Sequence, residues 1–378
     1  MIIHNGLIFD AVQREPYTAD ILVQEGKIRQ IGNDLPADED VFDADGMRIY
    51  PGFVDAHTHV GVAGTAIGFE GSDYNEMSDC LTPHLRAIDS VNPFDASFAK
   101  AREAGVTCIA TGPGSANVVG GTWAAFKTYG ISADRMVIKD PVAMKCAFGE
   151  NPKSVYKEKG NRARMSTAAH LREILFKTKQ YLAKKEAADG DPSKEPAFDF
   201  KLEAMIPVIK KEIPLKAHAH QANDILTAIR IAKEFDVLLT LEHVTEGHLI
   251  ADILAEENYP LAVGPTMSSA SKVELKNKTW ETAGILSAKG CTVSIVTDHP
   301  FSMISYLPVY AGYCVKAGMD PFEALKAITI HPAKHILCAD RIGSIEEGKD
   351  ADLVFYDGDL FSSLSCVRHV MADGIMLK

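Results

Sequence analysis

The sequence predicts an α/β protein in which a (β/α)8 barrel carries a small β-sandwich domain built from both ends of the chain. Two observations predict this fold. Both ends have the alternating pattern of short strands, and the long middle alternates strand with helix.

The two ends of the chain share one style. "MIIHNGLIFD", "ADILVQEGKIRQIG" and "VFDADGMRIY" are short alternating runs, and Asn5-Gly6 and Glu25-Gly26 are hairpin signals between them. The far end repeats this style in "GSIEEGKDADLVFYDG" and "VRHVMADGIML". We therefore expect residues 1–50 and 341–378 to form one composite β-sandwich domain.

The middle, residues 51–340, contains eight strand-like runs with helical segments between most of them. A repeated β-α alternation of roughly 250 to 300 residues is typical of a (β/α)8 barrel. One of the intervening helices is "QANDILTAIRIAKEF", residues 221–235. The eight predicted strands cover residues 50–60, 106–112, 120–130, 141–150, 215–220, 237–244, 259–267 and 291–300.

Composition excludes several classes of function. The chain has 378 residues, is 46% hydrophobic and has a formal net charge of −12, which argues against a nucleic-acid partner. No apolar run approaches membrane-spanning length, and the first residues lack the pattern of a signal peptide. The seven cysteines are scattered without a C-x-x-C pair, which fits reduced thiols in the cytoplasm. Whether copies of the chain form a homo-oligomer stays open.

The first barrel strand ends in two histidines that face one way. In "YPGFVDAHTHVG", His57 and His59 are two residues apart, and residues two apart on a strand point to the same side. Neutral imidazole is a common ligand of zinc. This pair alone also fits two ordinary histidines bonded to nearby backbone, so the other strand ends must decide.

Those other strand ends carry further candidate ligands. The carboxyl ends of barrel strands hold the chemistry of this fold. Here they carry His218 and His220 on the fifth strand, His243 on the sixth and Asp298 on the eighth. Histidines on three strands and an aspartate on the last predict a metal site, in which either His218 or His220 is not a ligand.

The motifs "PGFVDAHTH", "TDHP" and "HPAKHILCADRIGSIEEGKDADLVFYDGD" resemble the amidohydrolase superfamily, in particular its imidazolonepropionase-like and prolidase-like branch. The resemblance covers nearly the whole chain. It implies a hydrolase with one or two divalent ions, usually zinc, and a small-molecule substrate. It further implies the ligands, with His57 and His59 on the more buried ion, His218 and His243 on the second, and Asp298 on the nucleophilic water.

The sequence matches the superfamily pattern least well at the residue that would bridge two ions. Two-metal members use a carbamylated lysine or a glutamate near the third or fourth strand. This chain offers Lys145 and Glu150 in "VAMKCAFGENPK". We expect Glu150, at the end of the fourth strand, to be the ligand, and Lys145 to remain unmodified. If neither touches metal, the site holds one ion.

The expected activity is hydrolysis of an amide C–N bond, in a cyclic amide, an N-acyl amino acid or a dipeptide. Asp298 would accept a proton from water that a metal ion acidifies. His220 or His299 would polarise the scissile carbonyl. Glu242 and Asp55 are candidates to orient the ligand imidazoles.

Two alternative functions remain. A deaminase of an aminated heterocycle is one, but many deaminases of this superfamily carry glutamate where this chain has Gln221, which cannot shuttle a proton. A non-catalytic scaffold is the other, and the full ligand set argues against it. The sequence leaves the substrate open. Candidate pocket loops are residues 82–89, 112–121 and 264–272, and Arg86 and His84 are candidates to hold a substrate carboxylate.

Overall fold

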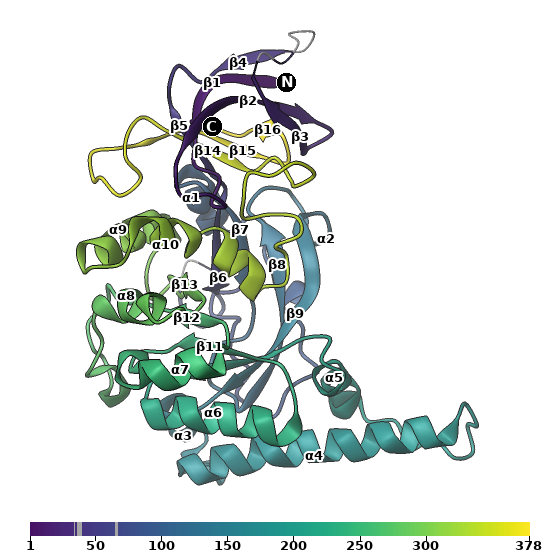
Figure 1. Ribbon diagram of the computed structural model, residues 1–378. Coiled ribbons are helices and arrows are strands. Elements are labelled where there is room, and N and C mark those ends of the chain that lie inside the picture. The colour runs from purple at the N-terminus through teal and green to yellow at the C-terminus, as the bar shows by residue number, and fades with distance from the viewer. Residues whose placement is uncertain (34, 36–39, 65–66) are drawn as a thin grey trace.

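A computed structural model describes residues 1–33, 35, 40–64 and 67–378. Figure 1 shows two bodies of structure, a sheet that contains both chain ends and, beneath it, a barrel with its helices. The terminal sheet has the order β16-β15-β14-β5-β1-β2-β3, and β4 pairs with β1. Its strands are β1 (Ile2–Ile8), β2 (Tyr17–Gln24), β3 (Lys27–Gly32), β4 (Val41–Asp43), β5 (Arg48–Pro51), β14 (Leu353–Tyr356), β15 (Val367–Ala372) and β16 (Ile375–Met376).

The second sheet is the predicted barrel, and its strands neighbour one another in chain order from β6 to β13. They are β6 (Phe53–Thr58), β7 (Val106–Thr111), β8 (Val119–Lys127), β9 (Val137–Ala147), β10 (Leu215–Ala219), β11 (Leu239–His243), β12 (Leu261–Val263) and β13 (Val293–Ile295). All eight predicted strands are present, so the (β/α)8 class is confirmed.

Backbone hydrogen bonds at two places close the barrel between its first and last strands. Just beyond β13, the Asp298 N–H donates to the His57 carbonyl at 3.0 Å, and the His59 N–H donates to the His299 carbonyl at 2.8 Å. At the opposite end of the seam, the backbone at residues 327–328 lies between the two strands and accepts from Val54 and Ile295, each at 2.8 Å. The closure holds the ends of β6 and β13 side by side, where His57, His59 and Asp298 stand.

One strand departs from the predicted alternation of strand and helix. β8 runs antiparallel to both β7 and β9. Only residues 112–118 join β7 to β8, and a parallel crossover needs a dozen or more residues. The chain therefore turns straight back at this point.

The helices cover the outside of the barrel. Asp95, Asp199 and Asp320 begin three of them by accepting backbone N–H groups of the first turn. Figure 1 shows α4 projecting well beyond the barrel. The helices are α1 (Ala96–Glu103), α2 (Ala133–Met136), α3 (Glu150–Val155), α4 (Arg164–Ala188), α5 (Phe200–Ile209), α6 (Ala222–Phe235), α7 (Ala251–Glu257), α8 (Glu281–Ala288), α9 (Leu307–Lys316), α10 (Pro321–Lys326) and α11 (Ile330–His335). None in the described ranges is long and apolar enough to span a membrane.

A buried cluster of charges joins the barrel to the terminal sheet. The Lys127 ammonium, at the end of β8, lies 2.7 Å from Asp352, 2.8 Å from Asp373 and 3.0 Å from Asp350. These aspartates come from the C-terminal segment, so the ion pairs fix that segment on the barrel. We propose residues 1–50 and 341–378 as one domain and residues 51–340 as the other.

Candidate metal centre

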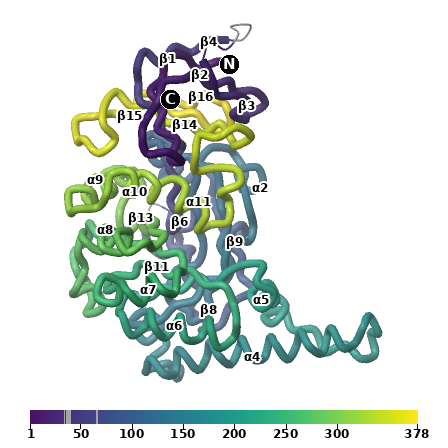
Figure 2. The backbone as a smooth tube through the Cα atoms, viewed as in Figure 1, coloured from purple at the N-terminus to yellow at the C-terminus, as the bar shows by residue number. Residues whose placement is uncertain are grey.

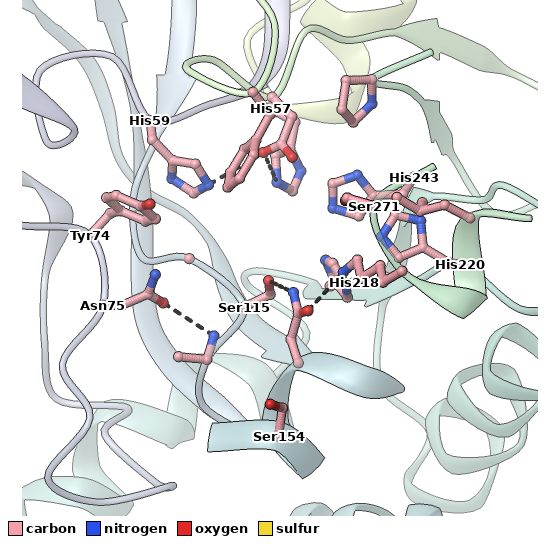
Figure 3. A pocket seen from close by; sticks show the side chains of 18 of the residues that line it. His57, His59, Tyr74, Asn75, Ser115, Ser154, His218, His220, His243 and Ser271 are labelled. Atoms are coloured by element: carbon pink, nitrogen blue, oxygen red, sulfur yellow. Dashed lines mark hydrogen bonds and ion pairs between the residues drawn. The ribbon is translucent and has the colours of Figure 1, made fainter. Parts of the chain in front are cut away.

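Two groups of metal-ligating side chains face one cavity of about 480 Å³. The first group is His57, His59 and Asp298, all buried, with one ligand atom from each within 4.8 Å of the others. The alternation of β6 turns both histidines inward, as the sequence predicts. Figure 3 shows His57 and His59 on one side of the cavity and the other histidines across from them.

The hydrogen bonds of the first group fix where its lone pairs point. Nδ1 of His57 lies 2.6 Å from the Glu242 carboxylate, and Nδ1 of His59 lies 2.8 Å from the Gly112 carbonyl. Both partners accept, so both Nδ1 atoms carry the proton. Each Nε2 therefore presents a lone pair toward Oδ1 of Asp298, at 3.7 Å from His57 and 3.4 Å from His59. Three converging acceptors repel one another unless a cation lies between them, so this group fits a divalent ion.

The second group is His218, His220 and His243. Both ring nitrogens of His218 are buried without a hydrogen-bond partner in the described structure, as expected of a side chain whose partner is a metal ion. His243 donates from Nδ1 to the Gly264 carbonyl at 2.7 Å, and burial lowers its pKa to about 4. It is therefore neutral at pH 7, which is the form that binds metal.

The structure brings His218 and His220 together, although the sequence predicts that only one of them is a ligand. Nδ1 of His220 lies 2.7 Å from the Thr245 hydroxyl. A hydroxyl can donate as well as accept, so either nitrogen of His220 can carry the proton. His220 is thus able to donate from Nε2 into the cavity, whereas His243, with its proton fixed on Nδ1, cannot.

Lys145 lies inside the barrel on β9 and lines the same cavity. Its side chain is fully buried, and Nζ is 3.2 Å from Nε2 of His57. Burial lowers its pKa to about 8. Burial also lowers the pKa of His57 and His218, and the nearby Lys145 adds to the effect in both. This lysine therefore contacts the first histidine group at His57 and shares a cavity with the second.

Glu150 lies elsewhere than the sequence predicts. β9 ends at Ala147, and Glu150 is the first residue of α3. The chain turns at Gly149, whose φ of 80° is favourable for glycine. Within the described residues, Glu150 belongs to neither ligand group and does not line the cavity. Its placement at a strand end was wrong, because a glycine turn separates it from the strand.

The predicted supporting residues divide into two kinds. Glu242 contacts the His57 ring directly, and its neighbours Lys216 and His335 hold its pKa well below the usual range despite complete burial. Asp55 instead joins β6 to the segment after β13, by accepting from the His57 and Thr297 backbones. Burial raises the Asp55 pKa to about 7. His299 does not line the cavity, and its Nε2 lies 2.9 Å from the Ser97 hydroxyl, so the donor role suggested for it lacks support here.

Two of the three predicted loops line the cavity. Residues 112–121 contribute Gly114, Ser115 and Ala116, and residues 264–272 contribute Pro265, Ser268, Ser269, Ser271 and Lys272. Residues 82–89 do not reach it. Arg86 and His84 border a neighbouring cavity of about 730 Å³, and the exposed Arg86 pairs with Asp89 at 2.6 Å. The carboxylate-binding role suggested for them therefore lacks support at this cavity.

Several functional candidates were not found from the sequence. Tyr74 stacks on His59 with ring centroids 4.9 Å apart. Glu274 is buried, lies 3.8 Å from Nε2 of His220 and pairs with Lys272 at 2.7 Å. Tyr74 stands in a turn and Glu274 in a single 3-10 turn, Val273–Leu275, which are too short for a periodic pattern to mark them. Serine clustering in "PTMSSASK" was the only local signal near Glu274.

The chain was compared with known proteins. The model of the "Amidohydrolase family" matches residues 48–376. A crystal structure of an amidohydrolase from Thermotoga maritima is 40% identical with a TM-score of 0.96, and the match covers 100% of this chain and 99% of that one.

Two more distant matches agree. An amidohydrolase of Hapsidospora irregularis is 28% identical over 95% of this chain, which spans 40% of that relative's length. A prolidase complexed with N-methylphosphonate-L-proline is 15% identical, with a TM-score of 0.60 and coverage of 100% of this chain and 99% of that one, which shows a shared fold. The family model covers most of the sequence, and the chain belongs to the amidohydrolase family.

Proposed function

We propose that the protein is a metal-dependent hydrolase that cleaves an amide C–N bond of a small molecule. The observation that carries this proposal is the pair of ligand groups on one cavity, each with unpaired ring nitrogens or lone pairs directed inward. A divalent ion held there, zinc by its preference for imidazole, would make a water molecule acidic enough to attack near neutral pH. The seven cysteines are all free, which supports the cytoplasm as the place of action.

The chain's own residues supply the proton transfers. We assign His57 and His59 to one ion and His218 and His243 to a second. Asp298 is ionised at neutral pH, because its pKa is lowered overall despite burial, with the nearby Lys145 among the causes. It accepts the proton of the attacking water and passes it to the leaving nitrogen. His220 donates from Nε2 to the carbonyl oxygen, where negative charge develops.

Lys145 replaces Glu150 as the proposed bridge between two ions. The neutral amine would attack carbon dioxide: an N–C bond forms as one C=O π bond opens, and the nitrogen gives up one proton to water, so the product is a carbamate anion. Burial lowers the pKa of the Lys145 amine to about 8, so a substantial fraction of this amine is neutral near pH 8, which supports the step. The 3.2 Å contact with His57 supports the position.

The charges of the cavity favour an uncharged substrate. Apart from the ligand groups and Lys145, the charged side chain that lines it in the described structure is Lys272. Glu274 neutralises Lys272 at 2.7 Å, and Asn151 accepts a further bond from it at 2.7 Å. A dipeptide would bring a carboxylate that needs a free cation. We therefore propose a neutral amide, such as a cyclic amide, held by the hydroxyl and amide groups of the wall.

Metal analysis joined to a substrate panel tests the function. Purified protein should contain one or two divalent ions per chain and should hydrolyse a cyclic or acyclic neutral amide. Chelation should abolish hydrolysis, and added zinc should restore it. The Arg86→Ala variant, altered outside this cavity, should behave as wild type. Protein that is folded yet binds no divalent ion would refute the proposal.

Ammonia release without amide cleavage would instead identify a deaminase. The structure does not favour this outcome, because Gln221 bonds to Arg164 at 2.5 Å and does not line the cavity.

A further inference from the structure

Beneath the first ligand group lies a carboxylate with an unusually complete set of donors. Glu242 is fully buried on β11, and its Oε2 accepts from His57 at 2.6 Å and from the Lys216 ammonium at 2.8 Å. Its Oε1 accepts from the Thr240 hydroxyl at 2.8 Å and lies 2.7 Å from Nε2 of His335. Four donors leave this carboxylate little freedom to rotate.

His335 reaches this carboxylate from outside the strands. It is the last residue of α11, which follows the backbone segment that separates β6 from β13 at the far end of the barrel seam. Neighbouring residues of this segment, Ala333 and Ile336, pack in one apolar cluster with Val54 and Ala56 of β6. Figure 2 shows α11 beside β6, between the barrel and the terminal sheet. The helix thus forms part of the barrel floor, and His335 is its polar contact with the metal centre.

The contacts join into one path. His335 and Lys216 hold Glu242, and Glu242 holds the His57 ring with its proton on Nδ1. Lys216 also donates to the Ala56 carbonyl at 3.0 Å, next to His57 on β6. The His335, Glu242 and His57 side chains are 0–1% exposed. Water therefore cannot substitute for a lost donor as it would at the surface.

We propose that His335 is a positioning residue, which acts through Glu242 to aim Nε2 of His57 into the metal centre. The inference rests on the proposed metal function and adds a residue 93 positions away from Glu242 in the sequence. Without the His335 bond, Oε1 loses a buried donor and Glu242 can rotate. The His57 ring then loses its fixed orientation, and metal affinity falls. Removal of a hydrogen-bonding partner behind a ligating histidine typically costs ~10–100-fold in metal affinity.

Two amide substitutions distinguish the loss of the hydrogen bond to Glu242 from the loss of the imidazole ring itself. In His335→Gln, the side-chain amide nitrogen stands about where the imidazole Nε2 stood, so it can still donate to Glu242. In His335→Asn, the amide is too short to reach. Ile336→Val, in the same buried segment without contact to Glu242, is the matched control. For each variant we would measure zinc affinity by competition with a chelator, and the melting temperature of the metal-free protein.

We expect ~10–100-fold weaker zinc binding in His335→Asn, and near wild-type binding in His335→Gln and Ile336→Val. The metal-free Asn variant should melt at a lower temperature than the Gln variant, because a buried acceptor of Glu242 loses its donor, and both variants should be folded at the temperature of the zinc assay. Equal zinc affinity in the Asn and Gln variants would overturn the positioning role. If His335→Asn does not fold, reduced affinity in a folded His335→Gln would equally overturn it, since that variant keeps the bond. Wild-type protein that binds no metal would instead refute the proposed function.

Discussion

Nζ of Lys145 lies 3.2 Å from Nε2 of His57, inside the cavity that both histidine groups line. A lysine at that distance from a metal-ligating nitrogen repels a divalent cation while it is protonated. Once carbamylated, the same side chain attracts one. In the proposed metal centre, the chemical state of this residue would therefore decide how many ions are held.

Replacement of Lys145 by methionine, which keeps the length without the amine, should leave at most one ion per chain. Activity should fall by more than ~100-fold, since a bridging ligand is lost. Metal content and kcat/KM measure the effect. The matched variant Glu150→Gln should keep both. A ¹³C resonance that appears with labelled carbon dioxide and is absent in Lys145→Met would identify the carbamate. If Glu150→Gln loses metal and Lys145→Met does not, Glu150 and not Lys145 is the bridging ligand.

His218 and His220 should behave differently when each is replaced by alanine. His218→Ala should lose zinc, because both of its nitrogens lack any other partner in the described structure. His220→Ala should retain zinc and lose kcat by ~10²–10³-fold, as expected for a donor to a developing oxyanion. Metal analysis beside steady-state kinetics distinguishes the two. The reverse pattern would show that His220 is the ligand.

Glu274→Gln should change which substrates are accepted. The substitution removes the charge that neutralises Lys272 and preserves size. An amide that carries a carboxylate should then gain in kcat/KM relative to its neutral analogue, by roughly tenfold or more for a new charge pair in a partly buried site. Ser269→Ala, which lines the same cavity without a charge, should leave the ratio unchanged. An unchanged ratio in Glu274→Gln would remove the electrostatic basis for a neutral substrate.

Lys127→Met should destabilise the protein strongly at neutral pH. It would leave Asp350, Asp352 and Asp373 without their shared ammonium, and breaking a buried ion pair typically costs about 3–5 kcal/mol. Burial opposes ionisation of Asp350, yet Lys127, together with Lys27 and Arg341, lowers its pKa overall. A lowered carboxyl pKa stabilises the fold above its unfolded value and loses that effect as the pH falls through the folded value.

The difference between wild type and Lys127→Met should therefore shrink on acidification, as the pH falls through the range in which these aspartates take up protons, and Asp352, whose pKa burial raises despite Lys127, takes up its proton first. Denaturant unfolding at several pH values measures it. The exposed Lys184, changed to methionine, is the control. A difference independent of pH would mean that packing, and not charge, accounts for the loss.

The sequence predicts the strands well because their signals are local. Buried runs of five to ten residues and the period of two place His57 and His59 on one side without any knowledge of the fold. It also contains the signal for the reversed β8, since seven residues, 112–118, are too few for a parallel crossover. The overall alternation of strand and helix predicts parallel strands throughout, whereas the length of this loop predicts the reversal.

What the sequence could not predict depends on distant contacts. The direction of Lys145 is set by pairing of β9 with β10, where Lys145 stands beside Lys216. Every residue from Val142 to Phe148 is buried, so no alternation marks an inward side. His335 and Glu274 reach the centre from an α-helix and a short 3-10 helix that follow later strands. Their roles depend on the closed barrel, which no local pattern encodes.

The order of the terminal sheet has a consequence for synthesis of the chain. β14 pairs with β5, yet some 300 residues separate them, from Pro51 to Leu353. At ~5–20 residues per second, a ribosome needs about 15–60 s to pass from one strand to the other. During that time the edge of β5 has no β14 to cover it, and an uncovered strand edge readily pairs with other chains. The nascent protein thus depends on prompt release of its last residues, and chaperones that shield strand edges should influence its yield more than its final stability.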